Sequence, residues 1–380
     1  MTDQFQLNED QLAIQDMARR FTADAITPHA ARWDEEHHFP RDVITSTAEL
    51  GFGGIYVSEE SGGIGLGRLE SAIIMEAMAY GCPTTSAFIS IHNMSAWMID
   101  KFGGAEVKAR YLPDLVAMNK LASYALTEPG SGSDAAALNT TARLEGTHYV
   151  LNGTKQFTTG GGVNDVYVTM VRTGEHKTKG ITCLVIDKDA PGVSFGVPEK
   201  KLGWNASPTA QLIFEDAKVP VINRVGEEGD GFRIAMMGLD GGRLNIGACS
   251  LGGAQRCLDE AIAYTKDRKQ FGARIADLQN TQFMLADMAT DLEAARALLY
   301  LAAVKVTNDA PDKSRFSAMA KRLATDSGSK IANDALQLFG GYGYLKDYPI
   351  ERFWRDLRVH SILEGTNQIM RMIVGRDLLS

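Results

Sequence analysis

The middle of the chain contains short apolar runs with no helix-length segment between them, and this feature constrains the fold most. The runs occupy residues 149–151, 166–171, 181–186 and 212–214. The dipeptide Asn152-Gly153 is typical of a two-residue hairpin turn, so we expect a turn there. Strands that follow one another directly favour an antiparallel barrel or sandwich over a doubly wound sheet. No G-x-G-x-x-G follows a strand, so a Rossmann dinucleotide site is not expected.

The segments on both sides of this region have helical patterns. Asn8 can cap a first helix, with Gln11 at the reciprocal capping position. Gly340-Gly341 is expected to stop a long helix, and Thr366 to cap a last one over about 367–379. We therefore expect a mainly α protein with a central antiparallel β-barrel domain. The expected domains are an N-terminal helical domain at 1–120, a middle β domain at 121–230 and a C-terminal helical bundle at 231–380.

Charge and composition exclude several classes of protein. The chain has 39 basic and 47 acidic residues, a net charge of -8, which does not favour a nucleic-acid partner. No apolar run approaches the roughly 20 residues that a membrane-spanning helix needs. The four cysteines and seven histidines show no metal-ligand spacing, so we expect no metal and buried free thiols. The first residues, Met1-Thr2-Asp3-Gln4, lack the character of a signal or transit peptide, which predicts a cytoplasmic location.

Four separated motifs resemble signatures of the acyl-CoA dehydrogenase family, in the family's order along the chain. They are Tyr124–Asp134 (YALTEPGSGSD), Arg268–Gly272 (RKQFG), Gln337–Tyr344 (QLFGGYGY) and Ile362–Asn367 (ILEGTN). The resemblance implies a helical domain, a β domain and a C-terminal four-helix bundle. It also implies a homotetramer built as a dimer of dimers.

The resemblance implies FAD as cofactor and α,β-desaturation of an acyl-CoA thioester. Glu364 matches the family's base, which removes the proton next to the thioester carbonyl, and a buried site would raise its pKa. The backbone N–H of the base and a ribityl hydroxyl bind the thioester oxygen in the family. Relatives that carry the base on an earlier helix have it where this chain has Gly242, so no rival base stands there. Without the resemblance, Glu364 would be as well explained as an exposed loop carboxylate.

Three groups of residues match the family's cofactor contacts. The strand and loop of the first motif would line the flavin, as would the segment after it, where many relatives have tryptophan in place of Phe157. The second and third motifs would hold the ADP half, partly from the neighbouring subunit, and the last helix start adds contacts. The residues are Tyr124, Leu126, Thr127, Gly132, Ser133, Phe157, Thr158, Thr159, Arg268, Gln270, Phe271, Gln279, Gln337, Gly340, Gly341, Thr366, Asn367 and Gln368. Taken singly, each would be explained as a loop, strand or surface residue without a ligand.

The matches to substrate-binding positions are Ser133, Asp240, Arg243, Gly365 and Arg376. Members that act on short branched chains are most similar in three segments, Gly203–Asn205, Leu239–Arg243 and Gly343–Tyr348. Isobutyryl-CoA, from valine breakdown, is therefore the expected substrate. 2-Methylbutyryl-CoA and short straight-chain thioesters stay open, and the expected electron acceptor is electron-transfer flavoprotein. Oxidase, nitroalkane oxidase and hydroxylase relatives are disfavoured by chain length or by the glutamate. A non-catalytic acyl-CoA-binding scaffold on the same fold is the alternative from another class.

Overall fold

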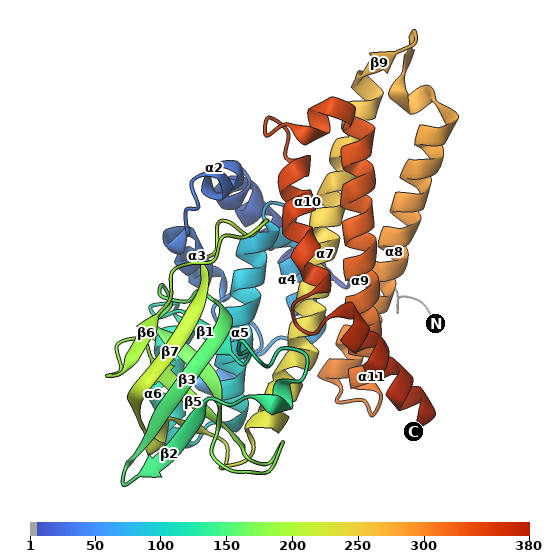
Figure 1. Ribbon diagram of the computed structural model, residues 1–380. Helices are drawn as coiled ribbons and strands as arrows, with labels where there is room; N and C mark the ends of the chain where they lie inside the picture. Colours follow the sequence, from blue (N-terminus) through green and yellow to red (C-terminus); the bar gives the residue numbers. More distant parts are fainter. Residues whose placement is uncertain (1–5) are drawn as a thin grey trace.

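The computed structural model describes residues 6–380, with helices at both ends of the chain and a β sheet between them (Figure 1). The N-terminal helices are α1 (Glu9–Phe21), α2 (Ala30–Glu35), α3 (Arg41–Ser46), α4 (Arg68–Ala79), α5 (Pro83–Phe102) and α6 (Ala105–Val116). The predicted capping box at the start of α1 is confirmed. Asn8 Oδ1 accepts from the Gln11 N–H at 2.8 Å, and Gln11 Oε1 accepts from the Asn8 N–H at 3.1 Å.

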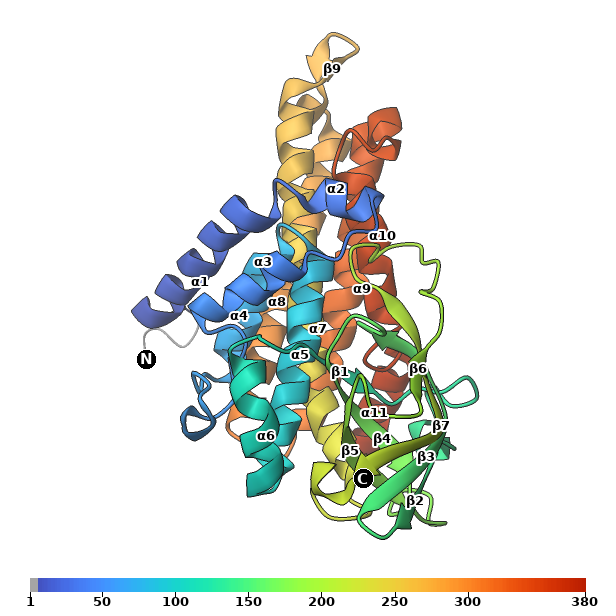
Figure 2. The same cartoon turned by 90° about the vertical axis from the view of Figure 1, so that its left-hand side faces the viewer.

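Helix α5 joins the two halves of the molecule. It lies between the sheet and the long C-terminal helices in Figure 1, and Figure 2 shows it running beside α7. Its residues are buried almost throughout, because it contacts β1 on one side and α7 on the other. His92 on α5 fixes this arrangement with both ring nitrogens. Nε2 bonds to the Leu115 carbonyl at the end of α6 at 3.0 Å, and Nδ1 accepts from the Ala122 N–H at the start of β1 at 3.1 Å.

The sheet contains eight strands in the order β6-β7-β3-β2-β4-β5-β8, with β1 also paired to β4. The strands are β1 (Ala122–Ala125), β2 (Thr141–Glu145), β3 (His148–Thr159), β4 (Val166–Arg172), β5 (Ile181–Asp187), β6 (Val193–Phe195), β7 (Thr209–Pro220) and β8 (Arg224–Val225). The predicted central β domain is confirmed, but its pairing is mixed. Both β1 and β2 run parallel to β4. Within residues 6–380 the edge strands β6 and β8 do not pair, so the sheet is open along this path.

The hairpin turn expected at Asn152-Gly153 is wrong. The chain turns at Gly146-Thr147, and both predicted residues lie inside β3, where its pairing with β7 shifts register. Gly153 has φ +142°, and an added Cβ there would lie 2.7 Å from Thr140 Oγ1. Gly153 therefore forms a β-bulge, which is a common position for glycine inside a strand.

The C-terminal part consists of long helices packed side by side (Figure 1). Its elements are α7 (Gly231–Asp267), α8 (Gln279–Thr307), α9 (Lys313–Phe339), α10 (Ile350–Arg358), α11 (Asn367–Leu379) and a two-stranded tip of β9 (Lys269–Gln270) and β10 (Ala273–Arg274). Helix α9 contacts α7, α8, α10 and α11, in agreement with the expected bundle. As predicted, α9 ends just before Gly340, and Thr366 caps α11 by accepting from the Ile369 N–H.

The element type changes after Val116 and again at Gly231. We keep 1–120, 121–230 and 231–380 as proposed domains. All four cysteines are free and buried, as expected. No helix within the described part of the chain is long and apolar enough to cross a membrane.

Candidate active site

Glu364 lies on a tight turn between the 3-10 segment Val359–Ser361 and α11. Its φ is +56°, which is uncommon for a residue with a side chain, and Gly365 follows at φ +90°. Such a conformation persists only when the surrounding structure holds it, and it is common at functional sites. Within the described residues, the N–H of Glu364 has no hydrogen-bond acceptor. The turn therefore presents both a carboxylate and a free backbone donor.

The Glu364 carboxylate is pressed against the backbone of α7. A Cβ added at Gly242 would lie only 2.5 Å from Glu364 Oε2 and 3.0 Å from Met94 Sδ. Oε2 is buried and has no hydrogen-bond partner among residues 6–380. Burial raises the pKa of Glu364 to about 7, although the charges of Arg243 and Lys321 oppose the rise. Glycine at 242 thus leaves the space that the carboxylate fills, and no rival base stands there.

Two buried cations hold the backbone of this turn. Arg243 Nε donates to the Glu364 carbonyl at 3.3 Å, and Lys321 Nζ donates to the Gly365 carbonyl at 2.8 Å. Asp240 in turn orients Arg243, with 2.7 Å between its Oδ1 and Arg243 Nη1. The other Asp240 oxygen accepts from Ser314 at 2.6 Å. Asp240 and Arg243 therefore help to hold the base-bearing turn, and their contact with the substrate stays a prediction.

Aromatic rings and a third cation complete the surroundings of the carboxylate. Tyr124 on β1 has a buried hydroxyl with no partner in the described part of the chain. Its pKa is well above the ordinary value because of burial and the Glu364 charge. The Arg68 guanidinium lies 3.7 Å from the ring centre of Tyr56 and 4.9 Å from that of Trp97. Aromatic rings and buried polar groups therefore surround Glu364 on this side.

The loop after β1 is anchored by a buried ion pair that the sequence analysis did not identify. Lys155 Nζ lies 2.7 Å from Glu128 Oε1 and also donates to the Leu126 carbonyl at 3.3 Å. Glu128 further accepts from the N–H groups of Asn139 and Thr140 at 2.6 and 2.9 Å. Burial lowers the pKa of Lys155 to about 8. The pair holds the predicted flavin-lining residues Leu126 and Thr127, which are half-buried, in one fixed loop.

The next predicted flavin contacts lie at the end of β3, where the strand pairing shifts. Phe157 has φ +56° and a side chain that is 63% exposed, which is unusual for a large apolar residue. Thr158 is buried, and its hydroxyl has no partner among the described residues. The Thr159 carbonyl accepts from the Ser123 hydroxyl, which ties β3 to β1. A bound planar group could stack on the exposed ring of Phe157 and accept a hydrogen bond from the unpaired Thr158 hydroxyl.

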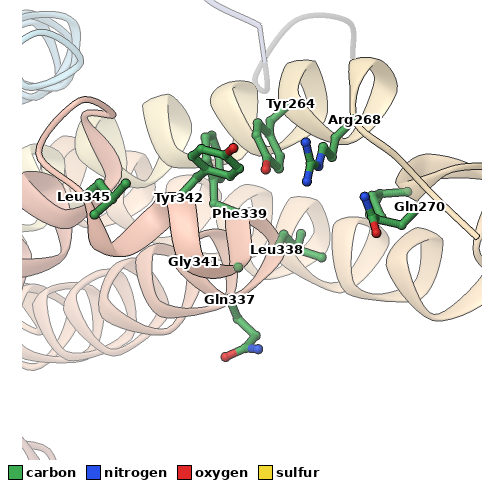
Figure 3. A pocket seen from close by; sticks show the side chains of 11 residues that line it. Tyr264, Arg268, Gln270, Gln337, Leu338, Phe339, Gly341, Tyr342 and Leu345 are labelled. Atoms are coloured by element: carbon green, nitrogen blue, oxygen red, sulfur yellow. The ribbon is translucent and has the colours of Figure 1, made fainter.

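A second site lies at the far end of the bundle, in a hollow of about 460 Å³ between α7 and α9 (Figure 3). Five of its lining residues are predicted contacts of the ADP half, namely Arg268, Gln270, Gln337, Gly340 and Gly341. Arg268 lies 5.3 Å from the ring centre of Tyr342 and forms no ion pair within residues 6–380. The predicted contacts Phe271 and Gln279 are exposed and do not line the hollow.

The two sites are too far apart to share one cofactor within one chain. Gly242, against Glu364, and Arg268, at the end of α7, are connected by continuous helix. At about 1.5 Å per residue, the helix separates them by about 39 Å. That distance exceeds the length of an extended flavin adenine dinucleotide. A cofactor that uses both kinds of site must therefore take them from two subunits.

The remaining predicted site residues fall into two groups. Asn367 is buried, and its side chain bonds to Lys321, Thr325 and Asp326, so it can offer a ligand only its backbone. The other residues are exposed at loop or helix positions, and their contacts with a ligand stay predictions, namely Gly132, Ser133, Gln368 and Arg376. Gly365 and Thr366 lie on the base-bearing turn.

Sequence reasoning missed Lys321 and Arg68. Lys321 had a usable signal, because it interrupts a buried face of small residues that runs through Ser317, Ala324 and Gly328 on α9. A lone cation at such a position must find partners inside the protein. Arg68 gave no such signal, since an arginine in the first turn of a helix is ordinarily exposed.

Sequence similarity to known proteins identifies the class to which this fold and site belong. The sequence matches the N-terminal domain of acyl-CoA dehydrogenases over residues 8–119, the middle domain over 123–217 and the C-terminal domain over 229–379. The chain belongs to the acyl-CoA dehydrogenase family, and it is an oxidoreductase.

Individual relatives are similar over nearly the whole chain. Mitochondrial isobutyryl-CoA dehydrogenases from Dictyostelium discoideum and Bos taurus are 56% and 52% identical to it over 98% of this chain and 90% of theirs. Butyryl-CoA dehydrogenase from Megasphaera elsdenii matches in structure with a TM-score of 0.96 at 37% identity, covering 99% of this chain and 100% of that one. The predicted family and fold are confirmed.

FAD is the cofactor of this family, and the residues present fit it. On β1 and β3, the buried hydroxyls of Tyr124 and Thr158 have no hydrogen-bond partner among the described residues. At the bundle tip, Cβ atoms added at Gly340 or Gly341 would meet no atom within 4 Å, so a ligand can approach the backbone there. Arg268 supplies a charge suited to a pyrophosphate.

Proposed function

We propose that this protein oxidises a short branched acyl-CoA, with isobutyryl-CoA as the preferred substrate, and that Glu364 is the base. The observation that carries the proposal is Oε2 of the Glu364 carboxylate, which is buried against Gly242 and has no hydrogen-bond partner among residues 6–380. Its pKa of about 7 makes it a competent base near neutral pH. The alternative, an exposed loop carboxylate without a catalytic role, explains neither the buried oxygen nor the raised pKa.

The chain's own groups divide the work at the thioester. Glu364 takes the α-proton, and its free N–H donates to the thioester oxygen, where negative charge develops. A positioned donor of this kind is typically worth about 2.7–4 kcal/mol of the barrier. The cations Arg243, Lys321 and Arg68 outnumber the carboxylates Asp240 and Glu364 here, which favours that charge. When bound, the flavin supplies the hydride acceptor that no side chain can provide.

The choice of acyl chain rests on the relatives. The two isobutyryl-CoA dehydrogenases are more similar to this chain than the butyryl-CoA enzyme is. One methylene changes discrimination by only about 1–3 kcal/mol, so 2-methylbutyryl-CoA and butyryl-CoA are expected as slower substrates. We assign the reaction to valine breakdown on the same basis.

The proposed partners follow the family. The chain would assemble as a tetramer of two dimers, with each FAD held by Glu364-side residues of one subunit and tip residues of its neighbour. Exposed aromatic residues at the tip, including Phe271 at 96% exposure, support a covered surface there. Electron-transfer flavoprotein is the proposed acceptor, and a chain in a structure of an Acidaminococcus fermentans electron-transferring flavoprotein is 43% identical to this one. The cytoplasmic location stays a prediction, which cell fractionation would test.

The test is anaerobic reduction of the bound flavin, followed by its visible absorbance. Isobutyryl-CoA, 2-methylbutyryl-CoA and butyryl-CoA are mixed separately with the protein, with Glu364→Gln and with the exposed control Glu175→Gln. We expect the fastest bleaching with isobutyryl-CoA and none on the same timescale in Glu364→Gln. Faster bleaching by another thioester would overturn the substrate. A yellow protein that no thioester reduces would indicate a non-catalytic scaffold.

A further inference from the structure

Lys321 is a buried cation that the reaction as described uses only for its charge, although its hydrogen bonds also fix it in one place. Its side chain is fully buried on α9, in the middle of the bundle. Lysine is rarely buried in this way unless it is paired. It forms no ion pair within residues 6–380, so its environment has to compensate for the lost hydration by other means.

The ammonium group is held by the turn that carries Glu364. Lys321 Nζ donates to the Gly365 carbonyl at 2.8 Å and to Asn367 Oδ1 at 3.0 Å. Asn367 is fixed from its other side, where its Nδ2 donates to Thr325 Oγ1 at 2.9 Å and to Asp326 Oδ1 at 2.7 Å. Lys321 thus joins the residue after Glu364 to the first turn of α11.

These contacts stabilise the strained backbone of the turn. The left-handed φ of Glu364 costs free energy that neighbouring contacts must offset. The Gly365 carbonyl, drawn toward Lys321, and the Glu364 carbonyl, drawn toward Arg243, fix both peptide planes that follow the base. The Glu364 carboxylate and its free N–H are thereby kept in one orientation.

The charge of Lys321 also acts on Glu364. Burial lowers the pKa of Lys321 to about 8, so it is still protonated at pH 6–7, where Glu364 titrates. A neighbouring cation favours the carboxylate form. The other charged or titratable groups that face this pair are Arg243 and Asp240 on α7, Cys249 on α7, Arg68 on α4, Asp326 on α9, Tyr56, Tyr124 on β1 and His360.

We propose that Lys321 is a positioning residue that holds the base-bearing turn by its hydrogen bonds and keeps Glu364 ionised by its charge. The inference rests on the proposed role of Glu364 as base. It separates two contributions, hydrogen bonding and charge, that substitutions at one position can distinguish. Glutamine keeps a donor but no charge, methionine keeps neither, and arginine keeps both.

The experiment measures the rate of flavin reduction by saturating isobutyryl-CoA from pH 5.5 to 9 in the holoenzyme. In Lys321→Met and Lys321→Gln, we expect the acidic limb of the profile to move to higher pH by about one pH unit. The rate at pH 6 then falls about tenfold, and at pH 9 Lys321→Gln stays within about threefold of the unchanged protein. Lys321→Arg should keep the original limb. The control is Lys330→Met, an exposed lysine on the same helix.

An acidic limb that stays in place in Lys321→Met overturns the proposal, even if the rate falls uniformly, because uniform loss is the sign of a purely structural role. If Lys321→Met does not fold, the same criterion applies to Lys321→Gln against Lys321→Arg. Glu364→Gln is measured in parallel. If that variant still reduces its flavin, the proposed base is wrong. If it is inactive and the limb is unmoved, only the role of Lys321 is wrong.

Discussion

At the scale of single residues, α7 has glycine at two adjacent positions where side chains from other elements contact its backbone. The Arg68 guanidinium lies where a Cβ of Gly241 would point, 2.4 Å from Nη1, and Glu364 fills the equivalent space at Gly242. A helix interior glycine costs about 0.5–1 kcal/mol relative to alanine. The two glycines allow a carboxylate and a guanidinium to approach the helix backbone at adjacent positions.

Gly242→Ala should displace the Glu364 carboxylate without unfolding the protein. A misplacement of about 1 Å in a reacting group can cost about 100-fold in rate, and we expect a loss of flavin reduction of that order. Stopped-flow reduction and FAD content measure the two effects separately. Gly375→Ala is the matched control, because a Cβ there meets nothing within 4 Å. A Gly242→Ala protein that reduces its flavin at the original rate would contradict the geometry.

The buried ion pair of Lys155 and Glu128 is expected to contribute to the stability of the protein. Lys155→Met leaves Glu128 buried without its counter-charge, which should lower the free energy of unfolding by about 3 kcal/mol. Urea unfolding at neutral pH measures the change. Lys177→Met removes an exposed bridge to Asp134 and should change it by no more than about 0.5 kcal/mol. Equal effects of the two variants would show that burial of the first pair does not matter.

At the scale of elements, His92 connects three of them through a neutral ring. Burial lowers its pKa from 6.5 to about 4 in the folded protein, so the unfolded chain binds more protons between those values. Its contribution to stability is present above pH 6.5 and is lost as the pH falls toward 4. At pH 5 the loss from this residue is about 2 kcal/mol.

His92→Gln should therefore make unfolding less sensitive to acid. Urea unfolding at pH 7.5 and pH 5 compares the variant with the unchanged protein and with the exposed control His38→Gln. We expect the difference between the two pH values to shrink only in His92→Gln. The same pH dependence in all three proteins would mean that other groups, such as buried His360, dominate the acid sensitivity.

Elements set by local chemistry were predictable from sequence, and those set by distant neighbours were not. The capping box of Asn8 and Gln11 and the cap at Thr366 form between residues three positions apart, so their signals lie in short stretches. Asn152-Gly153 carries an equally local signal, but pairing with β7 across 60 residues overrides it. The parallel pairing of β1 with β4 is likewise a long-range choice that alternation within a strand cannot reveal.

At the scale of the whole molecule, the candidate site divides into a base end and a tip end. The sequence, through its resemblance to a family, identified Glu364 at one end and Arg268 at the other. It could not identify Lys321, Arg68 or the Lys155–Glu128 pair, because their importance arises only when separate helices and strands meet. Their burial and their partners are properties of the folded molecule.

The division of the site predicts that two inactive variants complement each other. Glu364→Gln damages the base end and Arg268→Ala the tip end, and each should be inactive alone, the second through lost FAD. When the two are coexpressed with different tags and purified as mixed oligomers, one site in each mixed pair has both ends intact. Flavin reduction should therefore return in the mixed protein. If the mixed protein stays inactive while it retains FAD, both ends belong to one subunit's site.

The role of Glu364 is tested most directly with isobutyryl-CoA deuterated at the α-carbon. Flavin reduction is followed anaerobically in the unchanged protein and in Glu364→Gln. We predict slower reduction with the deuterated substrate in the unchanged protein, because Glu364 removes that hydrogen as a proton. We predict a loss of about 10²–10⁴-fold in Glu364→Gln, the usual contribution of a general base. Reduction in Glu364→Gln at the original rate, with the same sensitivity to deuterium, would contradict the account.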